Sequence, residues 1–74
     1  MELSEFIKEK RKQTNLTQQD LAEKAGVGLR FVREMEQGKT TLRLDKVNQV
    51  LRLFGHEMAP TVMNREKILN YEAS

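Results

Sequence analysis

The stretch AEKAGVGLRFV, residues 22–32, constrains the fold of this chain more than any other. A helical pattern stops just before Gly26, and a second one begins soon afterwards at Leu29. Glycine suits the left-handed backbone that often ends a helix, where a side chain is unfavourable, so Gly26 closes the helix before the turn. Val27 then enters the core from the turn, and Gly28 is a tolerable N-cap for the helix after it. The stretch therefore predicts two short helices joined by a tight turn.

Apolar residues recur at helical spacing in four segments, which predicts a helical core. Ser4 is the expected N-cap of the first helix, which ends near Thr14. The second helix begins with the capping-box sequence TQQD at 17–20, where a Thr hydroxyl and an Asp carboxylate each accept a hydrogen bond from a backbone amide. The third and fourth helices are expected over residues 29–37 and 44–54.

The chain is one small domain with a thin core. It has 74 residues, of which 38% are hydrophobic, and a domain near this length buries only about 60% of its unfolded surface. Such domains often gain stability from a disulfide, a metal or a partner subunit. The sequence has no Cys and a single His, His56, so we expect no disulfide, no metal site and no cofactor. Oligomerisation is the remaining means of stabilisation.

The segment HEMAPT after Gly55 breaks the helical pattern. Because Pro60 cannot donate a backbone hydrogen bond, we expect a short strand that ends there or lies at a sheet edge. A strand with no partner in its own chain calls for a second copy. The residues expected to form this dimerisation strand are His56, Glu57, Met58, Ala59, Pro60 and Thr61.

Two short helices joined by a tight turn with Gly are typical of the helix-turn-helix, whose second helix enters the major groove of DNA. The sequence LTQQDLAEKAGVGLRFVREMEQGK resembles the core of the Xre/Cro/CI family of bacterial and phage repressors, and the resemblance covers residues 4–55. The version GxRFVxExExGK, followed by HEMAP, is most similar to HipB-type antitoxins, the partners of HipA-like kinases. The sequence departs from the family at Gly28, where Ser or Thr is usual.

The resemblance implies an all-α, compact domain of four to five helices, similar to that of lambda repressor, with a short C-terminal strand used in dimerisation. It also implies a structural ion pair between Arg11 and Glu36. For the residues from Asn64 onward, the two alternatives are a last short helix and a disordered tail. The expected parts are a helix-turn-helix DNA-binding domain over 1–55, a dimerisation strand over 56–61 and a tail over 62–74.

The expected DNA contacts lie at the start of the second helix, along the third helix and just after it. Arginine can bond guanine O6 and N7 together, and leucine can touch the methyl group of thymine. Arg30 can reach a phosphate instead, and a solvated charged face is the alternative for all of these side chains. The candidate DNA-binding residues are Gln18, Gly28, Leu29, Arg30, Arg33, Lys39, Thr40 and Thr41.

Charge and composition limit the other partners. A net charge of +2 fits a solvated surface as well as a nucleic-acid partner. MELSEFIKEKRK lacks the continuous apolar stretch of a signal peptide, and no later segment is apolar enough to span a membrane. We therefore expect a cytoplasmic protein with no membrane partner. No nucleophile and base pair, metal set or phosphate loop is present in the sequence, so we do not expect an enzyme.

Three functions fit these residues. The first is a homodimeric repressor on a palindromic double-stranded operator that is also the antitoxin of a HipA-like kinase toxin and represses its own operon. The second is a plain repressor of phage or restriction-controller type. The third is a protein-interaction adaptor that does not bind DNA. Residues 28–33 argue against it, because they include two arginines and no acidic residue. A toxin would bind the apolar side chains of the tail, which are Val62, Met63, Ile68, Leu69 and Tyr71. The alternative is that the tail folds back on its own dimer.

Overall fold

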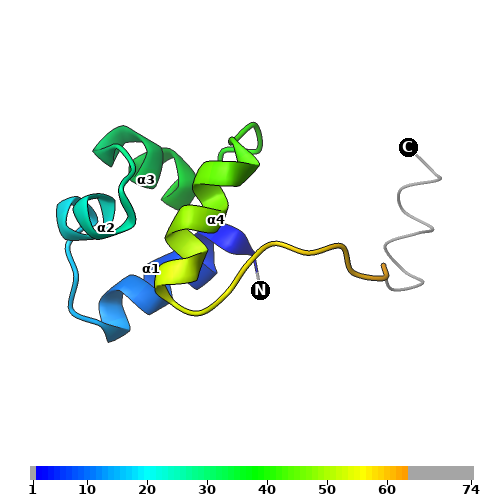
Figure 1. Ribbon diagram of the computed structural model, residues 1–74, viewed down its shortest axis with the longest axis horizontal. Coiled ribbons are helices and arrows are strands. Elements are labelled where there is room, and N and C mark those ends of the chain that lie inside the picture. Colours follow the sequence, from blue (N-terminus) through cyan, green and yellow to red (C-terminus); the bar gives the residue numbers. More distant parts are fainter. Residues whose placement is uncertain (1, 64–74) are drawn as a thin grey trace.

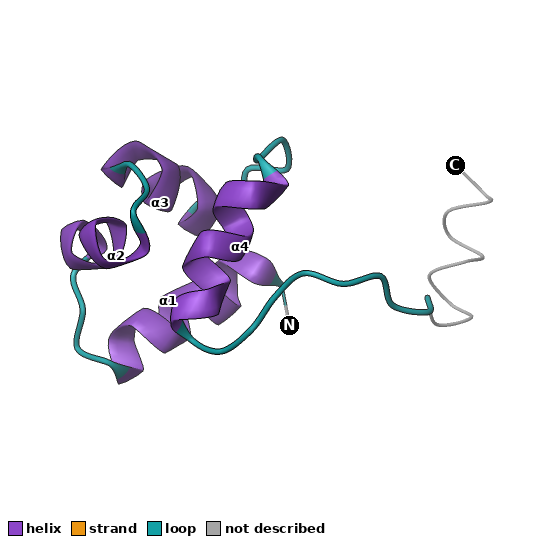
Figure 2. Cartoon of the chain, in the orientation of Figure 1, coloured by secondary structure: helices purple, strands orange, loops and turns teal. Residues whose placement is uncertain are grey.

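The computed structural model describes residues 2–63, and over this range the chain is an all-helical domain (Figures 1 and 2). The expected fifth helix from Asn64 lies outside the described residues. Within them, no helix is long and apolar enough to cross a membrane. The four helices of this range are α1 Leu3–Gln13, α2 Gln18–Ala25, α3 Leu29–Glu36 and α4 Leu44–Leu53.

Each of the four helices contributes a wholly buried side chain to the core. α3 packs against α1 and α2, and α2 also packs against α4. Helices of 8 to 11 residues are too short to be stable alone in water, so burial of these apolar faces holds them in place. The side chains at the centre are Ile7, Leu21, Val32 and Val50, each 0% exposed.

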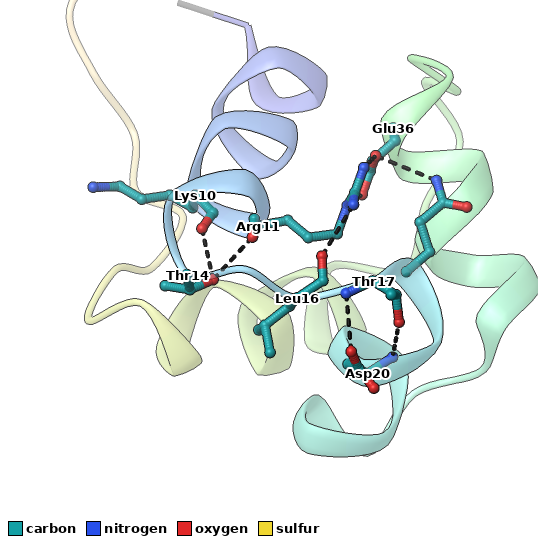
Figure 3. A network of polar contacts seen from close by, with 8 residues as sticks. Lys10, Arg11, Thr14, Leu16, Thr17, Asp20 and Glu36 are labelled. Atoms are coloured by element: carbon teal, nitrogen blue, oxygen red, sulfur yellow. Dashed lines mark hydrogen bonds and ion pairs between the residues drawn. The ribbon is translucent and has the colours of Figure 1, made fainter.

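The capping box expected at the start of α2 is confirmed (Figure 3). The Thr17 hydroxyl accepts from the Asp20 amide at 3.0 Å, and the Asp20 carboxylate accepts from the Thr17 amide at 3.0 Å. This second bond lowers the pKa of the Asp20 carboxyl, because it favours the ionised form. Two of the amides that a helix leaves unpaired at its N-terminus are thereby satisfied.

The turn between α2 and α3 has the expected backbone. Gly26 adopts the left-handed conformation with φ 73°, and the Val27 amide donates to the Ala22 carbonyl at 3.0 Å. Val27 is half-buried against the core, and Gly28 is the N-cap of α3. A contact that the sequence did not predict braces this turn: the Gln49 amide of α4 donates to the Ala25 carbonyl at 3.3 Å.

The start of α1 differs from the prediction. Ser4 is not its N-cap, because the helix begins at Leu3 with Glu2 in the capping position and no side-chain cap bond. The backbone explains the difference. The Glu2 carbonyl already accepts from the Phe6 amide at 3.0 Å, so the first turn forms before a Ser4 hydroxyl could cap it.

The strand predicted over 56–61 is wrong for the single chain. Within residues 2–63 no strand is present, and the segment after α4 is an exposed, extended arm that leads away from the helices (Figure 2). The Met58 amide is held by the Asn48 side-chain oxygen of α4 at 2.8 Å. A strand requires a hydrogen-bonding neighbour, and the described part of one copy offers none alongside this arm.

Substitutions of the two glycines in the turn test the backbone conformation assigned to each of them. Gly26→Ala should lower the free energy of unfolding by roughly 1 to 2 kcal/mol, because a Cβ is unfavourable in the left-handed backbone. The added Cβ would meet Gln49 Nε2 at only 3.7 Å, an ordinary contact, so the cost is in the backbone. Urea unfolding of the full chain measures this free energy.

Gly28→Ser is the matched control in the same turn. Gly28 has an ordinary φ of −75° and nothing within 4 Å of an added Cβ. Serine is a preferred N-cap, so this variant should be more stable by a few tenths of a kcal/mol. Equal losses of stability in the two variants would contradict the assigned backbone.

Candidate nucleic-acid interface

A shallow hollow of about 700 Å³ lies where the loop after α1, the start of α2 and the exposed side of α3 meet. Gln18 and Gln19, the first two residues of α2, line this hollow, and amides at a helix N-terminus favour phosphate. Arg33 brings an exposed positive charge from α3 to the same hollow. The residues that line it are Arg11, Asn15, Leu16, Thr17, Gln18, Gln19, Leu29 and Arg33.

A buried ion pair beneath this hollow joins three helices. Arg11 of α1 donates through Nε to Glu36 Oε2 at 2.8 Å and through Nη2 to Glu36 Oε1 at 3.1 Å (Figure 3). Gln18 of α2 donates to the same carboxylate at 3.3 Å. The Glu36 side chain is 3% exposed and that of Arg11 is 18% exposed. The bidentate geometry and the low exposure make this the strongest ion pair in the described part of the chain.

The remaining guanidinium nitrogen of Arg11 extends the link to the loop before α2. Nη1 donates to the Leu16 carbonyl at 3.1 Å (Figure 3). The charge-assisted bond that Arg11 donates to Glu36 is the main reason that the pKa of Arg11 is raised above its ordinary value. Gln18 was expected to bind a phosphate or to pack against α3, and its hydrogen bond ties it to the end of α3. The helix-turn-helix is therefore fastened to α1 by side chains as well as by apolar packing.

The exposed side of α3 carries the charged candidates. The Arg30 side chain is 92% exposed and donates through Nε to Glu34 Oε1 at 3.1 Å. Lys39, just after α3, donates to Glu34 Oε2 at 3.2 Å. Arg33 is exposed at the hollow. Leu29, the apolar candidate on α3, is half-buried and packs against the core.

Glu34 is the residue of this surface that sequence reasoning missed. Its carboxylate lies between two cations, and the hydrogen bond from Lys39 is the main reason that its pKa is lowered. The signal was present in the sequence, because Arg30 and Glu34 are four residues apart on one helix face.

The loop after α3 is exposed at Thr40 and Thr41, so their hydroxyl groups are open to solvent. Arg43, the N-cap of α4, donates to the Asp45 carboxylate at 2.8 and 3.2 Å. These bonds lower the pKa of Asp45.

The arm after α4 does not line the hollow between α2 and α3, but its Met58 shares a second hollow with Lys39 and Thr40. His56 meets Phe6 of α1 ring edge to ring face, with ring centroids 4.8 Å apart. Leu3, Phe6, Leu51 and Met58 line an apolar hollow at this place. The structure therefore brings Gln18, Leu29 and Arg33 together at one hollow, while Lys39 and Thr40 lie at another. The segment expected to dimerise contacts α1 and α4 and reaches this second hollow through Met58.

Comparisons with known proteins give the class to which this geometry belongs. A helix-turn-helix family model matches residues 7–58. The chain therefore belongs to the helix-turn-helix family of Xre/Cro/CI type.

A relative in Sinorhizobium fredii (strain NBRC 101917 / NGR234) is described as an uncharacterized HTH-type transcriptional regulator, y4mF. It is 53% identical over 45 residues, which span 61% of this chain and 59% of the relative. The chain therefore covers less than two thirds of that protein's length.

The buried ion pair leads to a stability prediction. Glu36→Gln should lower the free energy of unfolding by about 3 kcal/mol, because it leaves the partly buried Arg11 charge without a counter-charge. Glu23→Gln, on the exposed face of α2, removes the same charge and should change it by less than about 0.5 kcal/mol. Urea unfolding of both variants provides the comparison.

A double variant separates loss of the charge pair from poor packing. Replacing Arg11 with Met and Glu36 with Leu together should recover much of the loss, since neither charge is then left buried alone. The assigned role would be wrong if Glu36→Gln were as stable as Glu23→Gln.

Proposed function

We propose that the chain is a sequence-specific, DNA-binding transcriptional repressor that inserts α3 into the major groove. The observation that carries the proposal is the exposed Arg33 at the hollow between α3 and the N-terminus of α2, in a chain of helix-turn-helix type. A phosphate can bind the amides of Gln18 and Gln19 at the start of α2 while α3 lies along the base edges. The S. fredii relative, described as a transcriptional regulator, supports the same function.

The candidate contacts divide into two kinds. Arg33 and Arg30 extend from α3 and have the donors that guanine requires, while the half-buried Leu29 offers a smaller apolar contact to thymine. Lys39, Thr40 and Thr41 follow the helix and are exposed, which suits contacts to phosphates. Gly28, the N-cap of α3, adds a backbone amide at the start of that helix. Specificity then comes from α3 and orientation from the loop after it.

This division gives a prediction about two variants. Arg33→Ala should weaken binding to the operator by about 1 to 3 kcal/mol and relax the preference at one base pair. Lys39→Ala should weaken binding to all duplexes alike. Gel-shift titrations of both variants against a selected operator, its single-base variants and random duplexes make the measurement. Equal losses on operator and random DNA for Arg33→Ala would contradict base reading.

The repressor acts as a homodimer on a palindromic operator. The arm after α4 supports this proposal, since its backbone has no strand partner in residues 2–63. Apolar side chains of α4 and of the arm itself are exposed: Leu44 is 58% exposed, Leu53 41% and Met58 46%. Two copies joined through segment 56–61 would present their recognition helices about 34 Å apart, one turn of DNA.

Removal of the arm tests the dimer. A chain that ends at Gly55 keeps every core residue, from Ile7 to Leu51, and should fold as a monomer with much weaker operator binding. Sedimentation at micromolar concentration measures its mass, and circular dichroism checks that it remains helical. A truncated chain that is still a dimer would remove the arm from the interface.

The repressor is also the antitoxin of a HipA-like kinase, with which it represses its own operon. Two observations support this finer proposal. GxRFVxExExGK and HEMAP are similar to HipB-type antitoxins, and the exposed Val62 and Met63, 97% and 43% exposed, lie outside the α3 surface. A protein partner there leaves α3 free for DNA.

Co-purification with a HipA-like kinase encoded beside this chain tests the antitoxin role. The full chain should bind the kinase and DNA together, and a chain that ends at Thr61 should bind the kinase less well. Undiminished binding would remove the tail from that interface. No binding by the full chain would leave the plain repressor.

A further inference from the structure

We infer that Glu34 is a positioning residue for DNA reading: it holds the Arg30 guanidinium so that its two terminal nitrogens point outward to bond a base with two acceptors. The inference rests on the proposed function, since it assigns a role on the same α3 surface. It decides between the two contacts open to Arg30, a base and a phosphate, in favour of the base.

The bonds of Glu34 fix its carboxylate on both sides. One oxygen accepts from Arg30 Nε at 3.1 Å, and the other accepts from Lys39 Nζ at 3.2 Å. The Glu34 side chain is 24% exposed, so it is far less free than the arginine, which is 92% exposed. Lys39 occupies the other oxygen of Glu34, and the bond from Arg30 Nε alone orients the arginine.

The choice of donor matters for what Arg30 can do. Guanidinium has five N–H donors in a planar fork, and Glu34 uses the one on Nε. Both terminal nitrogens then remain for the O6 and N7 acceptors of guanine, which arginine can bond together. A side chain held in this way loses less freedom on binding than one that is free in solution.

The negative charge of Glu34 has a second effect. It partly neutralises Arg30 and Lys39, the cations that would otherwise attract any DNA backbone. Non-specific binding depends on the number of phosphates that such cations neutralise. Glu34 therefore lowers the attraction for random DNA while it orients a base contact, and both effects favour the operator over random sequences.

Two substitutions of Glu34 separate orientation from charge. Glu34→Ala removes both, so discrimination at one base pair of the operator should fall about tenfold or more. Affinity for random DNA should rise severalfold, with a steeper salt dependence. Glu34→Gln keeps an oxygen that can accept from Arg30 Nε, so it should raise random binding yet keep most of the discrimination. Glu9→Ala, which removes the same charge from the exposed face of α1, should keep full discrimination.

A double variant identifies Arg30 as the residue through which Glu34 acts. In the Arg30→Ala background, Glu34→Ala should cause no further loss of discrimination, because the oriented side chain is already absent. Gel-shift titrations against every single-base variant of the operator, with urea unfolding of each protein, make these measurements. Unfolding should be almost unchanged, since exposed ion pairs contribute little to stability.

The outcomes separate this inference from the proposed function. If Glu34→Ala keeps full discrimination at every base pair while Arg33→Ala loses it at one, the inference is wrong and the repressor stands. The inference is also wrong if Glu34→Ala loses discrimination equally with and without Arg30, since Glu34 would then contact a base itself. If neither Glu34→Ala nor Arg33→Ala changes discrimination, base reading by α3 fails as well.

Discussion

The ion pair between Arg11 and Glu36 is the interaction on which the geometry of the DNA surface depends. It fastens the last residue of α3 to the last turn of α1, while Gln18 fastens the first residue of α2 to the same carboxylate. A carboxylate that is 3% exposed is tolerable only because these donors surround it. The pair does not need to add stability relative to an apolar core, and its bonds tie the start of α2 and the end of α3 to α1.

The exposed surface has a similar but weaker network, in which one carboxylate bonds two cations. Below the surface, Glu36 joins three helices through charge-assisted bonds with little access to water. At the surface, Glu34 joins Arg30 and Lys39 through bonds that water screens. The first network therefore sets where α3 lies, and in our proposal the second sets how one of its side chains is presented. The two carboxylates differ in burial far more than in chemistry.

Much of the fold could be predicted from local sequence signals. The capping box of Thr17 and Asp20, the left-handed Gly26 and the bounds of α3 all depend on residues close in sequence, where propensity and backbone chemistry decide the outcome. Ser4 was wrongly predicted to be the N-cap of α1, because a hydroxyl caps a helix only from the residue before its first turn. Ser4 already lies inside the helix, which begins at Leu3. The arm after α4 was wrongly predicted to be a strand, because pairing of a strand depends on a neighbour, not on composition.

Contacts between helices were less accessible to sequence reasoning. The bond from Gln49 to the turn before α3 joins residues 24 positions apart, and nothing in the local pattern of α4 signals it. The half-burial of Leu29 depends on packing against a core to which all four helices contribute, and its local sequence does not show this. The pairing of Arg11 with Glu36 was expected from resemblance to a family, not from spacing, because 25 positions separate the two residues.

Nuclear magnetic resonance of the labelled full chain, titrated with a duplex selected from random sequences, tests the central claim most directly. The account predicts that backbone amide signals at the start of α2, along the exposed side of α3 and in residues 39–41 shift together on binding. Signals of residues buried in α4 should remain in place, because that helix lies behind the surface. Shifts concentrated in α4 and the arm, with α3 unchanged, would contradict the assignment of α3 as the recognition helix.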